Sequence, residues 1–337
     1  MKIFLVVVLG CFSLINGFSQ KADFYVTRSQ IKSDFKNYSA AIDDLDIAIQ
    51  MNPSNVHSYT LRGMAKFELK QFQEAIKDFN KAIHLKPKFW NVYYYRGRAK
   101  LQLDKFKEAE ADYSVFIKNN PNVAYAYYNR GIARSNLNNF KPALKDFNKA
   151  MLLDPDMEEI WYEMAYAKFG LDQIAEAIKD FDKAIEYDSS NNYAYKNRAL
   201  CKKKLNDFEG SLKDYSIAIA NDSCASKGYF YRAEIKVSLH DYQGAIEDYS
   251  KTIELNPIDI SAYINRGLTK SNLDNFSGAI EDFTLAIKLD PKNSEPYARR
   301  GFLKHLLQDK EGSCSDFSKA VELGEQNGVE MIKKFCK

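Results

Sequence analysis

The amino-acid sequence predicts an all-α solenoid built from helix-turn-helix repeats. Three observations predict this fold: a period of 34 residues, two apolar stripes of helical spacing within each period, and a low content of turn residues. The chain has 337 residues but only 15 Gly and 8 Pro, which argues against a fold of many short strands. A hairpin of this length cannot bury both of its faces alone, so neighbouring hairpins are expected to stack.

Nine repeats of 34 residues cover residues 22–327 without a gap or an insertion, within a repeat region assigned to residues 20–327. Positions are counted below from the first residue of each repeat, and the nine repeats begin at Ala22, Val56, Trp90, Ala124, Glu158, Asn192, Ser226, Ile260 and Ser294. Position 4 is a large aromatic residue in every repeat: Tyr25, Tyr59, Tyr93, Tyr127, Trp161, Tyr195, Tyr229, Tyr263 and Tyr297.

Each repeat contains two predicted helices. In the second repeat the first helix carries Tyr59, Met64 and Phe67 on one face, which is the spacing of an amphipathic helix. The second helix carries a similar stripe that includes Phe72 and Phe79, and in most repeats a proline at position 32 follows it and ends it. Residues 328–337 are predicted to form a C-terminal capping helix.

This pattern resembles the tetratricopeptide repeat (TPR) family. The shared features are the aromatic residue at position 4, small residues at positions 8, 20 and 27, an aromatic residue at position 24 and proline at position 32. The resemblance implies a right-handed superhelix and a non-enzymatic scaffold that binds other proteins, similar to exported bacterial members of the family. We therefore expect one continuous superhelix and not two domains.

Residues 1–19 have the features of a secretory signal peptide. A lysine precedes an apolar run over residues 3–15, and the small residues Gly17 and Ser19 stand two apart, as signal peptidase requires. We expect cleavage after Ser19 and an exported protein that is periplasmic, associated with the envelope or secreted, with no transmembrane span in the mature chain. A membrane anchor and a lipoprotein modified at Cys11 remain as alternatives, although the apolar run is shorter than the ~20 residues of a membrane span.

The charged positions of the repeat are predicted to be structural. Position 23 is Asp in all nine repeats, position 7 is Arg in all but one, where it is Met164, and position 11 is always basic. An inter-helix contact is needed in every repeat, whereas a catalytic site is not. We therefore expect ion pairs between positions 7 and 23 within a repeat: Arg62 with Asp78, Arg96 with Asp112, Arg130 with Asp146, Arg232 with Asp248, and Arg266 with Asp282.

The resemblance places the concave surface at positions 2, 5, 6, 9, 12 and 13. The candidate ligand groove, in the third to seventh repeats, comprises Tyr94, Tyr95, Arg98, Tyr125, Tyr128, Asn129, Tyr162, Tyr166, Phe169, Tyr193, Lys196, Asn197, Lys203, Phe230 and Tyr231. We expect about half of these aromatic rings to pack between helices and the others to bind a peptide or a partner segment, since tyrosine is favoured at interfaces. Lysines near the sixth repeat favour an acidic partner segment there. Recognition of an envelope glycan by the same tyrosines is the alternative.

Other chemistry is not indicated by the sequence. The chain carries 48 Lys and Arg against 45 Asp and Glu, too even a balance for a protein that binds nucleic acid by bulk charge. The sequence contains no phosphate-binding loop, nucleophile elbow or metal-binding motif, so we expect no enzymatic activity, metal or cofactor. In an oxidising compartment a disulfide is predicted between Cys314 and Cys336, while Cys201 and Cys224 are expected to be free.

Overall fold

The computed structural model describes residues 20–222, 226–325 and 328–336, and throughout these residues every regular element is an α-helix. The prediction of an all-α fold of paired helices is confirmed. The helices group into two compact units, Met1–Asp172 and Gln173–Lys337, which are described separately below. The predicted signal peptide and Cys224 lie outside the described residues.

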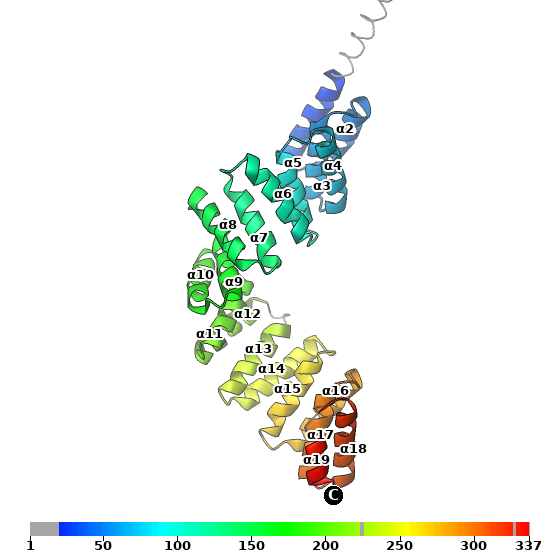
Figure 1. Cartoon of the computed structure of the whole chain (residues 1–337), viewed down its shortest axis with the longest axis vertical. Helices are drawn as coiled ribbons and strands as arrows, with labels where there is room; N and C mark the ends of the chain where they lie inside the picture. Colours follow the sequence, from blue (N-terminus) through cyan, green and yellow to red (C-terminus); the bar gives the residue numbers. More distant parts are fainter. Residues whose placement is uncertain (1–19, 223–225, 326–327, 337) are drawn as a thin grey trace, which may run out of the picture. The chain divides into compact units, whose positions relative to one another are not determined.

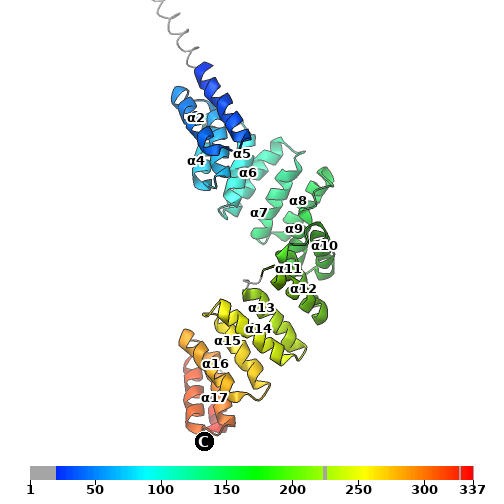
Figure 2. The same cartoon turned by 180° about the vertical axis from the view of Figure 1, so that it is seen from behind.

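The first unit consists of a helix over residues 20–34 followed by eight further helices (Figures 1 and 2). These are α2 (Tyr38–Met51), α3 (Val56–Glu68), α4 (Phe72–Leu85), α5 (Asn91–Leu101), α6 (Phe106–Asn119), α7 (Ala124–Asn136), α8 (Phe140–Leu153) and α9 (Ile160–Gly170). Helices α3 and α4, α5 and α6, and α7 and α8 form hairpins, and each hairpin packs on the next.

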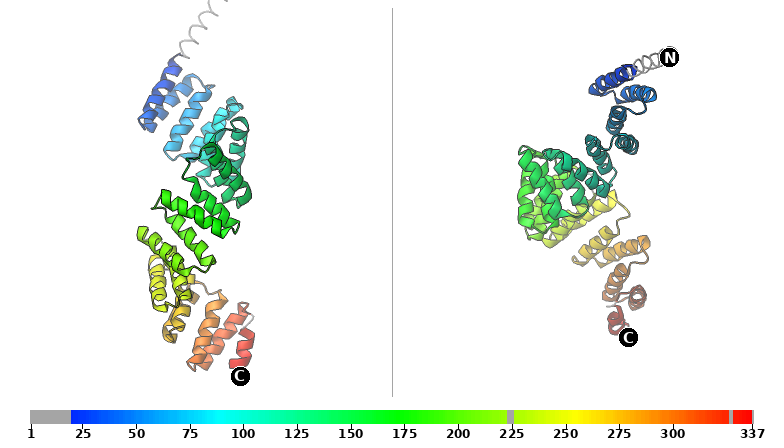
Figure 3. Two further views of the ribbon diagram at one scale, coloured as in Figure 1. Left: turned by 90° about the vertical axis from the view of Figure 1, so that its left-hand side faces the viewer. Right: turned by 45° about the horizontal axis from the view of Figure 1, so that its top comes forward.

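The second unit continues the pattern (Figure 3, left). Its helices are α10 (Ile174–Tyr187), α11 (Asn192–Lys204), α12 (Phe208–Asn221), α13 (Ser226–Ser238), α14 (Tyr242–Leu255), α15 (Ile260–Ser271), α16 (Phe276–Leu289), α17 (Ser294–Leu306), α18 (Lys310–Glu322) and α19 (Gly328–Phe335). The division between the units falls in the fifth repeat, whose position 7 is Met164 and not arginine. The single continuous superhelix expected from the sequence remains a prediction.

The turn between the two helices has the same pair of backbone hydrogen bonds in eight of the nine repeats. In the second repeat the Lys70 amide donates to the Phe67 carbonyl at 2.8 Å, and the Gln71 amide donates to the Lys66 carbonyl at 2.9 Å. This is a Schellman motif, which needs a left-handed residue after the helix and usually has glycine there. Here the left-handed position is occupied by Lys36, Lys70, Asp104, Asn138, Asp172, Asn206, His240, Asp274 and Gln308, with φ between 55° and 65°.

From the second repeat onward, the core of each hairpin is an aromatic ring from the second helix, whereas the first repeat has the buried Leu45 at this position. Phe79 is fully buried, and a Cβ atom added at Gly63 would lie 2.6 Å from its Cε1 atom. A small residue at position 8 therefore lets the first helix approach the ring. Position 24 is filled in the same way by Tyr113, Phe147, Phe181, Tyr215, Tyr249, Phe283 and Phe317, all of which are buried.

The repeated spacing of Arg and Asp produces a bidentate ion pair between the two helices of a hairpin. Arg62 donates from Nε to Asp78 Oδ2 at 2.9 Å and from Nη2 to Asp78 Oδ1 at 2.6 Å, and Lys66 Nζ lies 2.7 Å from Asp78 Oδ2. The predicted partners are joined in this way at Arg96–Asp112, Arg130–Asp146, Arg232–Asp248 and Arg266–Asp282, and three further pairs have the same geometry: Arg28–Asp44, Arg198–Asp214 and Arg300–Asp316.

The same arginines also link consecutive repeats, which the sequence analysis missed. Arg62 Nη1 donates to Asp46 of the preceding repeat at 2.5 Å, and Arg96 Nη1 donates to Asn80 at 2.7 Å. The acceptor is always at position 25. The sequence indicates this contact by the residue type at position 25, which can accept a hydrogen bond in every repeat: Asp46, Asn80, Ser114, Asn148, Asp182, Ser216, Ser250, Thr284 and Ser318.

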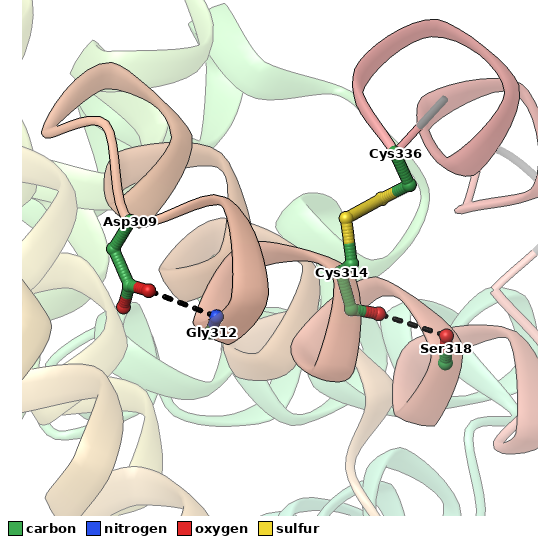
Figure 4. Close-up of a disulfide and its surroundings, with 5 residues drawn as sticks. All are labelled: Asp309, Gly312, Cys314, Ser318 and Cys336. Atoms are coloured by element: carbon green, nitrogen blue, oxygen red, sulfur yellow. Dashed lines mark hydrogen bonds between the residues drawn. A yellow bond between two sulfur atoms is a disulfide. The ribbon is translucent and has the colours of Figure 1, made fainter.

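The C-terminal helix covers the last repeat. Figure 4 shows the disulfide that joins Cys314 in α18 to Cys336, just after α19, with an S–S distance of 2.06 Å. Phe335 of α19 stacks on the buried ring of Phe317 with centroids 6.1 Å apart. Helix α19 therefore occupies the face on which a further repeat would otherwise stack, as a terminal cap does in repeat proteins.

Candidate functional site

Most aromatic residues at positions 5 and 6 of the first helices pack against the hairpin cores. Tyr94, at position 5, contacts Tyr113 of its own repeat with ring centroids 5.8 Å apart. Tyr95, at position 6, stacks on Phe79 of the preceding repeat at 6.2 Å. The same two contacts recur for Tyr128 on Phe147, Phe230 on Tyr249, and Tyr231 on Tyr215. Each of these five rings therefore packs against the framework on one side.

The tyrosine face is the name used here for Tyr94, Tyr125, Tyr128, Tyr162 and Tyr166, which lie on α5, α7 and α9 of the first unit. Helix α7 contacts both α5 and α9, so the three first helices lie next to one another. Tyr162 stacks on Tyr166 with centroids 6.5 Å apart, and Tyr166 also meets Phe140 at 6.2 Å. Asn129 donates a hydrogen bond to the Tyr94 hydroxyl at 3.3 Å and so joins α7 to α5.

Tyr125 is the most exposed member of the tyrosine face. Its side chain is 47% exposed, and its ring meets that of Tyr128 edge-to-face at 6.2 Å. The Tyr125 hydroxyl donates to Glu159 Oε1 at 2.7 Å, and this hydrogen bond to a carboxylate raises the pKa of Tyr125 to about 12. The contact connects α7 to the residue that precedes α9.

Glu163 is a candidate that the sequence analysis missed. It occupies position 6 of the fifth repeat, where the fourth and sixth repeats have Asn129 and Asn197. Its side chain is partly buried, and burial raises the pKa of Glu163 to about 7. Among the described residues, none donates a hydrogen bond to this carboxylate and no cation pairs with it. Its signal in the sequence was an acid between the two asparagines that occupy position 6 in the neighbouring repeats.

Two predicted groove residues of the first unit have other surroundings. The Arg98 guanidinium lies over the Phe67 ring, 4.6 Å from its centroid, as in a cation–π contact. Phe169 of α9 is partly buried. The Phe67 ring of α3 therefore holds the Arg98 guanidinium against the neighbouring first helix.

The predicted basic patch of the second unit is partly neutralised. Lys203 pairs with Glu234 at 2.8 Å, and Lys196 lies 3.9 Å from Asp222. Tyr193 is 70% exposed, and the Lys196 ammonium lies over its ring at 5.7 Å. Asn197 is partly buried. This charge pairing weakens the expectation that an acidic segment binds near the sixth repeat.

A cavity of about 430 Å³ lies in the second unit, in the seventh to ninth repeats, outside the predicted groove. Leu268, Phe283 and Phe302 form part of its apolar lining, and Asn265 and Arg299 contribute polar groups. The only ion pair of Arg299 in the described part of the chain is with Glu295, one turn earlier on α17, at 3.4 Å. The first helices of these repeats carry few aromatic residues on the expected concave surface, so the predicted groove did not include them.

Cys201 is the one cysteine of the described residues that lies outside the disulfide. Cys201 in α11 is buried and has no disulfide partner among the described residues, and burial raises the pKa of its thiol to about 11.

None of the helices in residues 20–222, 226–325 and 328–336 has the length and apolar character that a membrane span needs.

Comparison with known proteins identifies the family. Tetratricopeptide repeat models match residues 57–89, 91–122, 124–157, 158–191 and 260–293. Together with the repeated hairpins, these matches show that the chain belongs to the tetratricopeptide repeat family. Members of this family typically mediate protein–protein interactions and are usually non-catalytic. No curated protein matches the chain as a relative.

Solved structures share the fold at low sequence identity. A tetratricopeptide repeat protein from Parabacteroides merdae is 19% identical, with 74% of this chain and 99% of that chain covered and a TM-score of 0.55. The pilF protein of Pseudomonas aeruginosa is 15% identical, with 65% and 99% covered and a TM-score of 0.55. The APC/C hetero-tetramer Cut9–Hcn1 is 12% identical, with 94% and 76% covered and a TM-score of 0.52. These likenesses show the fold alone.

Proposed function

We propose that this protein is a non-enzymatic interaction scaffold that binds a peptide or an extended partner segment on the tyrosine face of its first unit. The observation that carries the proposal is the gathering of Tyr125, Tyr128 and Glu163, with polar groups at their outer ends, on neighbouring first helices. Tyrosine supplies a large contact area with few rotatable bonds and a hydroxyl for hydrogen bonding, and it is enriched at binding hot spots.

The test starts from a library because the partner is unidentified. A phage-displayed library of random dodecapeptides is selected on the protein, and enriched peptides are synthesised for calorimetry. The double variant Tyr125→Ala/Tyr128→Phe removes the exposed ring and the second hydroxyl while keeping the Tyr128 ring packed on Phe147. Tyr187→Ala is the matched control, since Tyr187 is a 53% exposed tyrosine on a second helix.

We expect enriched peptides whose affinity falls about tenfold in the double variant and is unchanged in the control, in line with the size of interface hot spots. Absence of any enriched peptide, or equal loss in the control, contradicts the proposal. Binding of a polysaccharide by the wild type and its loss in the double variant, with no peptide bound, would support the glycan alternative instead.

We also propose that the protein is exported, on the basis of residues 1–19. The disulfide between Cys314 and Cys336 supports this proposal because such bonds persist in oxidising compartments. Intact-mass measurement of the protein recovered from cell fractions tests it. The expected product begins at Gln20 and contains one disulfide, whereas an uncleaved chain in the cytosolic fraction would contradict export.

A further inference from the structure

We propose that Glu163 is the anchor for a basic side chain, arginine or lysine, of the segment that binds the tyrosine face. The inference rests on the proposed function, since it names the chemistry of the partner at the same site. It reverses the acidic partner that the lysines of the sixth repeat favoured.

The first argument is the unmatched carboxylate. Glu163 projects from α9 in the first unit and is partly buried, yet no cation or hydrogen-bond donor of the described chain meets it. An unpaired charge that is partly withdrawn from water is less stable than the same charge on an open surface, as the raised pKa of Glu163 indicates. A ligand that brings a positive charge and N–H donors to this carboxylate would remove that cost when it binds.

The second argument is the neighbourhood of Glu163. Burial raises the pKa of Tyr128 well above its usual range, and the nearby charges of Glu163 and Glu159 raise this pKa further. That hydroxyl has no hydrogen-bond partner in the described part of the chain. Glu159 lies one helical turn before Glu163 and accepts the Tyr125 hydroxyl at 2.7 Å. Both carboxylates thus lie within electrostatic range of the Tyr128 hydroxyl, and neither forms an ion pair with a cation of the described chain.

The third argument is the aromatic surface beside these acceptors. The rings of Tyr125 and Tyr128 meet edge-to-face at 6.2 Å, and their faces can receive a cation through the ring quadrupole. Carboxylates next to tyrosine rings suit a guanidinium or an ammonium on an aliphatic stem, because the stem packs on the rings while the charged head bonds the carboxylate. An acidic segment would instead meet two like charges.

The experiment compares peptides that differ in one charge. Three dodecapeptide pools share random flanks and carry Arg, Gln or Glu at the centre, and their binding is measured by competition against a labelled peptide from the library selection. The proteins are wild type, Glu163→Gln, and the control Glu158→Gln, which makes the same charge change at an exposed neighbouring residue. Glu163→Gln is expected to fold, since it removes an unpaired charge; circular dichroism and urea unfolding check this.

We expect the wild type to bind the Arg pool about tenfold or more tightly than the Gln pool, as for a desolvated charge pair. Glu163→Gln should lose this preference and keep its affinity for the Gln pool, while Glu158→Gln should keep the preference. Equal binding of the pools by the wild type, or a preference that survives in Glu163→Gln, overturns the inference and leaves the proposed function standing. Failure of every pool to bind contradicts the proposed function itself, and with it the inference.

A metal ion is the other cation that two carboxylates could attract. Calcium and magnesium chloride are therefore titrated into the same three proteins by calorimetry. No binding at millimolar concentration supports a basic side chain as the occupant. Metal binding that is lost in Glu163→Gln and that abolishes the preference for the Arg pool overturns the inference.

Discussion

The two carboxylates on Arg62 allow a direct measurement of what burial does to an ion pair. Asp78 accepts two hydrogen bonds from the guanidinium and lies 2.7 Å from Lys66 Nζ, with its side chain 6% exposed. Asp46, in the preceding repeat, accepts one hydrogen bond from the same guanidinium with its side chain 48% exposed. The perturbations are Asp78→Ala and Asp46→Ala, which each remove one carboxylate from the same cation.

The expected magnitudes differ because the environments differ. Removal of Asp78 leaves Arg62 and Lys66, whose side chains are 18% and 17% exposed, without their common counter-ion. Breaking a buried pair in this way costs ~3–5 kcal/mol. Loss of the exposed Asp46 should cost ~0–1 kcal/mol, because water replaces the lost contact and screens the charge.

The assay has to resolve single repeats, because solenoids can unfold in parts. Hydrogen exchange of the α3 and α4 amides reports the local free energy of opening, and urea unfolding followed by circular dichroism reports the whole chain. We expect faster exchange in α3 and α4 for Asp78→Ala and near wild-type exchange for Asp46→Ala. Loss of less than about 1 kcal/mol in Asp78→Ala, or equal losses in both variants, would refute the reasoning that burial sets the strength of the pair.

Three further predictions concern stability. Burial raises the pKa of Glu163 from 4.5 to about 7, so the folded chain holds this proton more tightly than the unfolded chain. The free energy of unfolding should therefore fall by up to about 3 kcal/mol as the pH rises from 4.5 to 7. Urea unfolding at pH 5 and pH 8 should show this loss in the wild type but not in Glu163→Gln, and an identical pH dependence of the two proteins would contradict it. Lys70 has a φ angle of 60°, so Lys70→Gly should raise the free energy of unfolding by ~0.5–1 kcal/mol in urea unfolding. Asn138→Gly should give a smaller gain because asparagine tolerates this conformation. A lower free energy of unfolding in both variants would contradict this expectation. The disulfide closes a loop with a sequence separation of 22, so the double variant Cys314→Ser/Cys336→Ser should lose about 3 kcal/mol of stability. Helix α19 should also become sensitive to proteases in this variant. Unchanged proteolysis would instead show that packing of Phe335 alone holds the C-terminal helix in place.

Periodicity made the fold predictable from the sequence. Each of the nine repeats places an aromatic residue at position 4 and Asp at position 23, so one error of register would have been visible against the other repeats. The hairpin, its proline stop and the approach of Gly63 to Phe79 follow from residue size and spacing within 34 residues. Local rules suffice because each repeat makes the same contacts with itself and its neighbours.

The candidate site was only partly predictable, because it depends on what each side chain meets across repeats. Three residues of the tyrosine face, Tyr94, Tyr125 and Tyr128, are the same type of residue. Tyr94 and Tyr128 pack on buried rings, whereas Tyr125 remains 47% exposed. The hydrogen bond from Arg62 to Asp46 likewise joins two repeats. Residue type specifies the possible contacts of such a side chain but not which contact is made.

The sequence alone therefore determined the repeat, its register, the helical hairpin and the family, since these depend on contacts that recur every 34 residues. The tertiary structure decided which tyrosines are framework, which lysines are neutralised and that Glu163 has no partner in the described chain. The physical reason is that burial and charge pairing depend on the packing around a particular residue. A repeat pattern describes only what the repeats share, so it does not predict the surroundings of a residue such as Glu163 that occurs in one repeat.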